Sequence, residues 1–297
     1  NQINLYGLDK NLKEFVNFFK KDKLPNKILL SGEKGIGKST LAYHLINFVL
    51  SQNEDFSYDL DNCSINEKNR SFKLILNQSS PNFTLIDISN EKKYIEISQV
   101  RNLISEMNKF SINNKPRFVL IDNIEYLNLN SINALLKILE EPNQDVYFVL
   151  IHNHKKILPT LNSRCLNFKI SLTKNESLNI TNQILDNNIF EKINTELINY
   201  YFTPGKFYNL VKFSEELDID LKNITLKDFL EKIIDAGYYK KNSSIKYMIY
   251  DFFELFFINK KLPDLYSYFL KKIDICKKFN LDEEIIFHEF KEKVLNE

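Results

Sequence analysis

Three groups of residues in this chain have types and spacings that could handle a phosphorylated ligand. The first is the loop Gly32-Glu33-Lys34-Gly35-Ile36-Gly37-Lys38-Ser39, in which glycines are followed by a lysine and a hydroxyl. The second is Asp122, a carboxylate after an apolar run, and the third is Arg164 on a later segment. Together they offer backbone N–H groups, two cations and a metal-binding carboxylate, which is the set that phosphoryl chemistry uses.

The loop at 32–39 has the pattern of a phosphate-binding loop. Glycines allow main-chain conformations that direct successive N–H groups at phosphate oxygens, and a helix after the loop adds its positive N-terminal end. Lys38 would contact the β- and γ-phosphates of ATP, and Ser39 would offer its hydroxyl to Mg²⁺. A chance glycine-rich turn is the alternative. The predicted nucleotide-binding residues here are Gly32, Glu33, Lys34, Gly35, Ile36, Gly37, Lys38, Ser39 and Thr40.

Asp122 ends an apolar run. P-loop proteins hold a carboxylate that supports Mg²⁺ at the end of such a strand, so we predict a metal role for Asp122 together with Ser39. A surface aspartate that caps a turn is the alternative. The next residue is Asn123, and an amide can orient water but cannot accept its proton. Glu125 lies three residues on, and we expect it beyond the strand end and on another face. The pattern therefore predicts at most a weak ATPase.

His152 follows the apolar run Val146 to Ile151. Resemblance to P-loop ATPases implies a polar residue that senses the γ-phosphate at this place, and a neutral imidazole could donate one hydrogen bond to a phosphate or a water. A structural histidine at a strand terminus is the equally weighted alternative. We interpret His154, two residues on, as a surface residue.

The elements that must position these groups alternate between strand and helix. Apolar runs at 27–31, 83–88, 118–122 and 146–151 predict strands, and helical spacing at 11–20, 41–49, 97–110 and 132–141 predicts helices, the last stopped by Pro142. Continuous apolar runs of this kind are typical of a parallel sheet covered on both faces. Residues 52–80 are polar and weakly patterned, which indicates a loop-rich insertion. Arg164 would then follow the last strand of the sheet.

After Leu172 the strand signals end and helical spacing dominates. We therefore predict α/β plus all-α architecture: a nucleotide-binding domain at 1–170, a small helical lid domain at 171–223 and a helical oligomerisation domain at 224–297. Large apolar residues such as Phe229, Phe252 and Phe269 fill the last region at helical intervals. Its most apolar run, 247–258, is too short to span a membrane and carries Asp251 and Glu254, so it predicts a buried or interfacial helix.

Composition excludes several classes of protein. The 297 residues carry 40 Lys and Arg against 39 Asp and Glu, so no basic excess indicates nucleic-acid binding by the whole surface. No signal-peptide pattern precedes Gly32, which favours a cytoplasmic protein. The cysteines and histidines lack metal-ligand spacing, so we expect no zinc; they are Cys63, Cys165, Cys276, His44, His152, His154 and His288.

One further pair of segments resembles a known family. These are Asn133-Ala134-Leu135-Leu136-Lys137-Ile138-Leu139-Glu140-Glu141-Pro142 and Leu158-Pro159-Thr160-Leu161-Asn162-Ser163-Arg164-Cys165. With the loop at 32–39 they are similar to the clamp-loader ATPases of the AAA+ superfamily, and to the delta prime subunit of bacterial DNA polymerase III within it. The match runs through roughly the first two thirds of the chain.

The resemblance implies a function in DNA replication. Such a subunit binds ATP with Mg²⁺, joins delta and gamma/tau subunits in a hetero-pentameric ring closed by a helical collar, and helps to place the sliding clamp on primed DNA. Arg164 would act in trans on a neighbour's ATP, where a planar guanidinium stabilises developing charge; a surface salt bridge is the alternative. The polymerase chemistry would lie in another subunit.

Thr203-Pro204-Gly205-Lys206 resembles the lid motif whose arginine touches nucleotide in active relatives, but Gly205 stands in that arginine's place. Nucleotide contact through Gly205 or Lys206 is therefore undecided, and a plain helix start is the alternative.

Other functions remain open from the sequence. A gamma/tau-type motor subunit would carry four zinc-binding cysteines and an Asp-Glu pair where this chain has Asp122-Asn123. A P-loop small-molecule kinase would carry a lid with phosphate-gripping arginines, and this chain has four arginines in all: Arg70, Arg101, Arg117 and Arg164. A scaffold with an inactive nucleotide site differs from the first hypothesis only in nucleotide binding.

Overall fold

The computed structural model describes residues 3–88, 94–107, 115–140, 145–153, 159–186, 188–199, 202–241, 243–279 and 281–296. The chain divides into two compact units. The first contains residues 1–180 together with Thr203–Gly205, and the second contains 181–202 and 206–297. Pro142, His154 and Leu158, which the sequence analysis used, lie outside the described residues.

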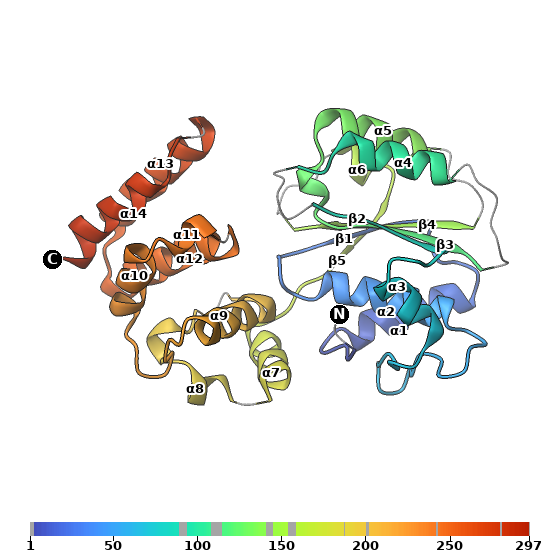
Figure 1. Cartoon of the computed structure of the whole chain (residues 1–297), viewed down its shortest axis with the longest axis horizontal. Coiled ribbons are helices and arrows are strands. Elements are labelled where there is room, and N and C mark those ends of the chain that lie inside the picture. Colours follow the sequence, from blue (N-terminus) through green and yellow to red (C-terminus); the bar gives the residue numbers. More distant parts are fainter. Residues whose placement is uncertain are drawn as a thin grey trace. The chain divides into compact units, whose positions relative to one another are not determined.

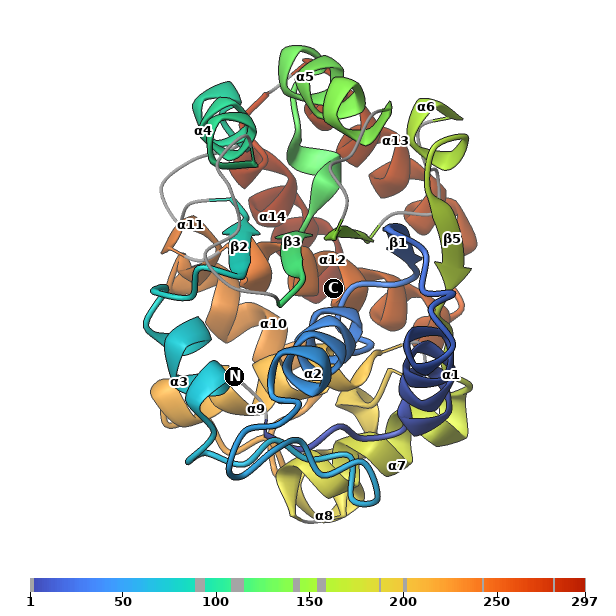
Figure 2. The ribbon, with the colours of Figure 1, turned by 90° about the vertical axis from the view of Figure 1, so that its right-hand side faces the viewer.

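The first unit is built on a five-stranded parallel sheet. Its strands are β1 (Lys27–Ser31), β2 (Phe83–Ile86), β3 (Arg117–Ile121), β4 (Val146–His152) and β5 (Leu166–Lys169). They lie in the order β2-β3-β4-β1-β5, and every neighbouring pair is parallel (Figure 2). The predicted α/β sheet is confirmed. β5 is an addition that the sequence analysis missed, and so Arg164 precedes the last strand instead of following it.

Helices cover both faces of this sheet (Figure 1). α1 (Asp9–Lys20), α2 (Lys38–Leu50) and α3 (Arg70–Leu76) lie on one face, and α4 (Ile97–Met107), α5 (Leu129–Glu140) and the short α6 (Pro159–Asn162) lie on the other. Side chains alternate between the two faces along a strand, and the central strands β1, β3 and β4 are buried on both faces along most of their length. In β1, Ile28 and Leu30 pack on the α1–α2 side, and Leu29 packs on the α4–α5 side.

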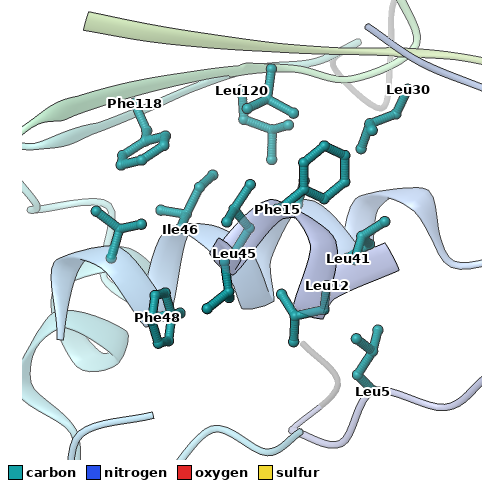
Figure 3. Packing of buried hydrophobic residues seen from close by; sticks show 14 of the residues in the cluster. Leu5, Leu12, Phe15, Leu30, Leu41, Leu45, Ile46, Phe48, Phe118 and Leu120 are labelled. Carbon is teal, nitrogen blue, oxygen red and sulfur yellow. The ribbon is translucent and has the colours of Figure 1, made fainter. Parts of the chain in front are cut away.

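The core between the sheet and α1–α2 is filled by large aliphatic and aromatic side chains. Phe15 of α1 and Leu45 of α2 pack below Leu30 of β1 and Phe118 of β3 (Figure 3). Phe15 and Phe118 are each 1% exposed. This packing fixes α2, and with it the loop that leads into α2, against the sheet.

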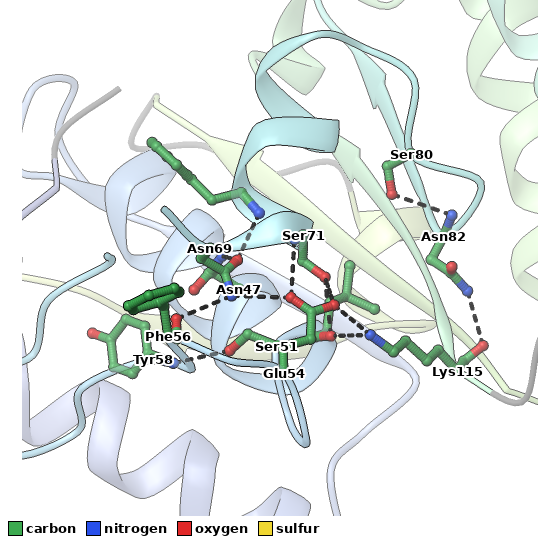
Figure 4. A network of polar contacts seen from close by, with 12 residues as sticks. Asn47, Ser51, Glu54, Phe56, Tyr58, Asn69, Ser71, Ser80, Asn82 and Lys115 are labelled. Carbon is green, nitrogen blue, oxygen red and sulfur yellow. Dashed lines mark hydrogen bonds and ion pairs between the residues drawn. The ribbon is translucent and has the colours of Figure 1, made fainter. Parts of the chain in front are cut away.

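Residues 52–80, predicted as a loop-rich insertion, contain α3 and a polar network that anchors the segment. Glu54 accepts hydrogen bonds from the Ser71 hydroxyl at 2.7 Å, the Lys115 ammonium at 2.7 Å and the Asn69 amide at 3.0 Å (Figure 4). Burial raises the pKa of Glu54, but the bonds from Lys115 and Ser71 outweigh burial and leave that pKa below its ordinary value. The insertion is therefore held by a satisfied, partly buried carboxylate.

The carboxyl ends of the central strands meet at one edge of the sheet. Ser31 at the end of β1 pairs with His152 at the end of β4, and Ile121 at the end of β3 pairs with Leu150. Ligands of open parallel sheets bind outside this edge. The loop after β1 and the residues after β3 and β4 are thus brought together by the topology.

The second unit is helical in its described residues. Two helices have residues in both units: α7 (Lys174–Leu185), and α9 (Pro204–Glu216), whose first two residues belong to the first unit. The other elements of the second unit are α8 (Ile189–Lys192), η2 (Thr195–Leu197), α10 (Leu226–Asp235), α11 (Tyr238–Lys241), α12 (Ser243–Lys260), α13 (Pro263–Phe279), α14 (Glu284–Phe290) and η3 (Lys291–Leu295). Phe253 and Phe290 stack with ring centroids 3.6 Å apart, and Phe252 packs against Phe229. These contacts show that the aromatic residues predicted in the tail form a core. The division into separate lid and collar domains at residue 223 stays a prediction.

Candidate nucleotide-binding site

The loop Gly32–Gly37 connects β1 to α2, as the phosphate-binding pattern predicts. Gly35 has φ 88° and Gly37 has φ 94°, a left-handed region that a side chain disfavours. α2 begins at Lys38, directly after Gly37. Ile36 is buried at 5% exposure and fixes the middle of the loop, while Glu33 and Lys34 are exposed.

Lys38 is the buried cation of the site, and the residue is 3% exposed. Its Nζ donates hydrogen bonds to the carbonyl of Gly32 at 3.0 Å and to that of Glu33 at 2.5 Å. Burial lowers the pKa of Lys38 to about 8, although the carboxylates of Asp122 and Glu125 act in the opposite direction. Lys38 is thus a charged group whose proton is held less firmly than that of a surface lysine.

Ser39 and Asp122, the two predicted metal-binding residues, lie side by side. The Ser39 side chain is hydrogen-bonded to the Asp122 carboxylate, which follows β3. Burial and the neighbouring charge of Asp87 raise the pKa of Asp122 to about 6. At neutral pH the pair still offers a carboxylate and a hydroxyl, which are oxygen ligands of the kind that Mg²⁺ prefers. These residues fit a magnesium ion bound with a nucleotide.

Asn123 is held in a chain of side-chain hydrogen bonds beside Asp122. Its amide donates to the Asp87 carboxylate at 2.8 Å, and its carbonyl oxygen accepts from the Asn153 amide at 2.9 Å. Asn123 itself has a left-handed backbone with φ 56°. The amide is therefore already oriented by two partners and has no group able to take a proton from water.

Glu125 is positioned differently from our expectation. It lies on the 3₁₀ turn η1 (Ile124–Tyr126), and its carboxylate accepts the backbone N–H of Asn153 at 3.3 Å. Its charge raises the pKa of Lys38. The prediction that this carboxylate lies on another face was wrong, because Glu125 lies on the turn that directly follows Asn123 and its charge acts on Lys38.

His152 and Asn153 follow each other at the end of β4 but differ in surroundings. His152 is 4% exposed, and its backbone carbonyl accepts the N–H of Gly32 at 3.3 Å. Asn153 is the residue that reaches Asn123. A sensing role for His152 stays a prediction. Asn153 is the polar side chain that the structure brings to the residue after Asp122.

Arg164 is held by contacts with residues of α5 and α6. Its Nε and one terminal nitrogen donate to the same carboxylate oxygen of Glu140, at 3.1 and 2.5 Å, and the other terminal nitrogen donates to the carbonyl of Thr160 at 3.2 Å. Glu140 is the last residue of α5, and 53% of its side chain is exposed. The surface salt bridge considered as an alternative is therefore present, and it leaves a third of the Arg164 side chain exposed.

Comparison with known proteins decides the family. The model of the family described as "DNA polymerase III, delta subunit" matches residues 7–174. The chain belongs to this family. The resemblance to delta prime subunits is confirmed, since curated relatives with that name match the chain.

Three relatives illustrate the similarity. The DNA polymerase III subunit gamma of Buchnera aphidicola subsp. Schizaphis graminum is 29% identical over 75% of this chain and 60% of its own length. The subunit delta′ of Pseudomonas aeruginosa is 32% identical over 46% of this chain and 40% of its length. The subunit delta′ of Buchnera aphidicola subsp. Baizongia pistaciae is 31% identical over 55% of this chain and 49% of its length. The chain thus spans about half the length of the curated relatives it matches.

Among solved structures, a DNA polymerase III gamma subunit-related protein from Thermotoga maritima matches 94% of this chain and 96% of that chain. The TM-score is 0.48 and the sequence identity is 15%.

Three residues that the structure places beside Asp122 and Asn123 were not predicted from the sequence: Asp87, Asn153 and Tyr43. Asp87 follows β2 as Asp122 follows β3, and this repeated carboxylate after an apolar run was a signal that could have been used. Asn153 is one residue from the predicted His152. Tyr43 gave no signal, and burial, followed by the charges of Asp122 and Asp87, raises its pKa to about 12.

A small cavity lies against α2. It has a volume of about 110 Å³ and is lined by Ser39, Thr40, Tyr43, Asn47, Ile65, Phe72 and Ile75. Ligand pockets usually measure roughly 300–1,000 Å³, so this cavity cannot hold a nucleotide by itself. Within the described ranges, no three His, Cys, Asp or Glu side chains are grouped as a metal site, and no helix is long and apolar enough to cross a membrane.

Proposed function

We propose that the chain is a delta prime-type clamp-loader subunit that binds ATP with Mg²⁺ and hydrolyses it slowly on its own. Membership of the DNA polymerase III delta subunit family supports the clamp-loader part of the proposal. The observation that carries nucleotide binding is the juxtaposition of buried Lys38, Ser39 and Asp122 at the carboxyl edge of the sheet. When bound, ATP would supply the γ-phosphoryl group and Mg²⁺ the charge that neutralises it.

The residues of this chain have separable roles in the proposal. The loop N–H groups and Lys38 bind the phosphates, and Ser39 with Asp122 holds the metal. Asn123, Asp87 and Asn153 fix an amide where a stronger ATPase would need a base. Slow turnover follows, because orientation of water without proton acceptance forfeits roughly a factor of 10² to 10⁴.

Partners and location belong to the same proposal. The subunit would join delta and gamma/tau subunits in a hetero-pentameric ring in the cytoplasm, and act on the sliding clamp and primed DNA through that ring. Arg164 would leave Glu140 and contact the ATP of a neighbouring subunit. The exposure of the Arg164–Glu140 pair supports this exchange, since an exposed ion pair contributes only about 0.2–1 kcal/mol.

A gamma-type motor is the second candidate, because the Buchnera gamma subunit matches 75% of this chain. Asn123 argues against it, since a motor needs a residue that activates water. Measured turnover of the lone subunit separates the two candidates.

The test is nucleotide binding by the isolated chain. Wild-type protein should bind a fluorescent ATP analogue with Mg²⁺, and Lys38→Ala should weaken binding by at least a hundredfold, since it removes the buried cation. Lys13→Ala, which removes an exposed lysine on α1, is the matched control. Absence of binding by wild-type protein would leave a scaffold subunit with an inactive site as the correct description.

A further inference from the structure

The segment Thr203–Gly205 has a position that its place in the chain does not predict. Residues on both sides of it belong to the second unit, but these three residues belong to the first. The sequence does not decide whether this segment touches nucleotide. In the structure the segment contacts the phosphate loop itself.

Two hydrogen bonds join this segment to the phosphate loop. The Thr203 hydroxyl donates to the carbonyl of Lys34 at 2.8 Å, and the Gly205 N–H donates to the carbonyl of Gly35 at 2.9 Å. Thr203 is 4% exposed, so water competes little for its hydroxyl. Both donors are neutral, and both acceptors are main-chain oxygens of the loop.

These bonds determine where the loop's N–H groups point. In a trans peptide the C=O and the following N–H lie in one plane and point in opposite directions. Holding the carbonyls of Lys34 and Gly35 therefore orients the N–H groups of Gly35 and Ile36. Lys38 does the same for the two preceding peptide units, because its Nζ binds the carbonyls of Gly32 and Glu33. Four successive carbonyls are thus tied back, two by Lys38 and two by this segment.

Gly205 is needed for the close approach. A Cβ at this position would lie 2.7 Å from the Cα of Gly35 and 2.9 Å from its carbonyl oxygen. Any side chain, arginine included, would displace the phosphate loop. The cation of the next residue is used elsewhere: the Lys206 ammonium pairs with Asp251 at 2.7 Å and lies over the Phe202 ring, all within the second unit.

We propose that Thr203 and Gly205 are positioning residues that latch the phosphate loop by two of its carbonyls, so that its N–H groups are preset for phosphate. This inference rests on the proposed function, since the loop must bind nucleotide for the latch to matter. In place of an arginine that touches the nucleotide, this segment orients the main-chain N–H groups of the phosphate loop.

The experiment compares variants that remove and restore one donor. Thr203→Val keeps the shape of the side chain and loses the hydroxyl, and Thr203→Ser keeps the hydroxyl. Thr203→Val should weaken binding of a fluorescent ATP analogue roughly threefold to tenfold, the factor that one hydrogen bond supplies, and Thr203→Ser should bind nearly as wild type. Gly205→Ala should weaken binding more than tenfold because its methyl group displaces Gly35.

A second measurement reads the loop directly. Hydrogen exchange of residues 32–37 in nucleotide-free protein should be faster in Thr203→Val and in Gly205→Ala than in wild type or Thr203→Ser. Gly237→Ala is the control for general destabilisation. Gly237 has φ 62°, and the nearest atom to an added Cβ is the Lys240 Cδ at 3.9 Å. This variant should lose stability and keep both loop exchange and affinity.

The outcomes separate the latch from the proposed function. If wild-type protein binds no nucleotide, the proposed function fails, and the exchange measurement still decides whether the latch exists. If Thr203→Val and Gly205→Ala leave loop exchange unchanged, or if Thr203→Ser loses as much affinity as Thr203→Val, the latch is wrong.

Discussion

Lys38 and Arg164 are both cations predicted to meet phosphate, and the structure gives them opposite surroundings. Lys38 is 3% exposed and held by carbonyls of its own loop at the edge of the sheet. Arg164 lies beyond α6, one third exposed, and is held by Glu140 and the Thr160 carbonyl. One cation is built into a preformed site, and the other is held by contacts that an incoming anion can replace.

The difference shows that burial affects the charge of a lysine and the charge of an arginine differently. Burial disfavours the charged form of Lys38 and lowers its pKa to about 8, against the opposing effect of the Asp122 and Glu125 carboxylates. An arginine stays charged in any protein environment, so Arg164 can sit at a surface and still act as a fixed cation. In the proposed function, Lys38 would contact the subunit's own phosphates and Arg164 those of a neighbour, so each residue would act where its chemistry is suited.

The largest effect we predict in the Arg164 region is on an assembled loader. Arg164→Ala should lower DNA-stimulated ATP hydrolysis by the reconstituted complex about tenfold or more, less than the 10³–10⁵ of a finger on which all turnover depends, because a ring shares the work among its sites. The variant's own ATP affinity should stay unchanged. Arg164→Lys should not restore activity, since an ammonium lacks the bidentate fork.

The control for this prediction is Arg101→Ala, which removes an exposed arginine on α4. It should hydrolyse ATP as wild type does. If Arg164→Ala instead lost its own nucleotide, or if the complex kept full activity, Arg164 would be a structural salt-bridge residue only.

A second prediction concerns the amide beside Asp122. Asn123→Glu alone should gain little turnover, because it places a second carboxylate against Asp87, to which the Asn123 amide now donates at 2.8 Å. The double variant Asp87→Asn, Asn123→Glu exchanges the two side chains, so that an amide donor at position 87 again faces a carboxylate acceptor at position 123. It should raise ATP turnover by the isolated chain about tenfold or more, since a carboxylate can accept the proton of water.

The two single variants control this exchange, and single-turnover hydrolysis with excess protein measures all three. Turnover of the double variant equal to wild type would show that the lack of a base does not limit this site.

The sequence predicts the buried site around Lys38 better than the exposed region around Arg164. The loop at 32–39 and Asp122 follow apolar runs, so their local pattern carries their position. β5 was missed because most of its side chains are exposed and form no apolar run. The Arg164–Glu140 pair joins residues 24 positions apart, and no local pattern encodes such a contact.

One omission and one error inside the site have local geometric causes. Asn153 was overlooked beside His152, and neighbouring residues on an extended chain point to opposite faces, so a shift of one residue selects a different side chain. Glu125 was expected on another face, but it lies on the 3₁₀ turn that follows Asn123, whose backbone has a positive φ. Apolar periodicity reveals neither feature, since left-handed residues and strand ends leave no repeating pattern.

A third prediction uses the pKa values of the buried site. Affinity for Mg²⁺ with ATP should fall as the pH rises through about 8, because Lys38 loses its proton, by up to tenfold for each further unit. Affinity should also fall as the pH drops below about 6, because Asp122 gains a proton. Fluorescence titrations between pH 5 and 9.5 test both limits.

Asp122→Asn sharpens the same measurement. It should remove the acid limit, and it should move the alkaline limit below pH 8, because the Asp122 charge raises the pKa of Lys38. Constant affinity from pH 7 to pH 9.5 in wild-type protein would mean that Lys38 does not bind the phosphates as a buried cation.

The smallest predicted effect concerns Glu140, the residue that holds Arg164 in the free chain. Glu140→Gln removes the ion pair, and because more than half of the Glu140 side chain is exposed, the free energy of unfolding in denaturant should change by less than about 1 kcal/mol. The reconstituted complex should hydrolyse ATP at a rate equal to wild type or up to about threefold higher, since the guanidinium no longer has to leave a carboxylate. Glu106→Gln, at an exposed position on α4, is the matched control and should change neither quantity. A loss of turnover as large as that of Arg164→Ala would reverse the interpretation. Glu140 would then be required to aim Arg164 at its target, and the two regions would both depend on contacts within their own chain.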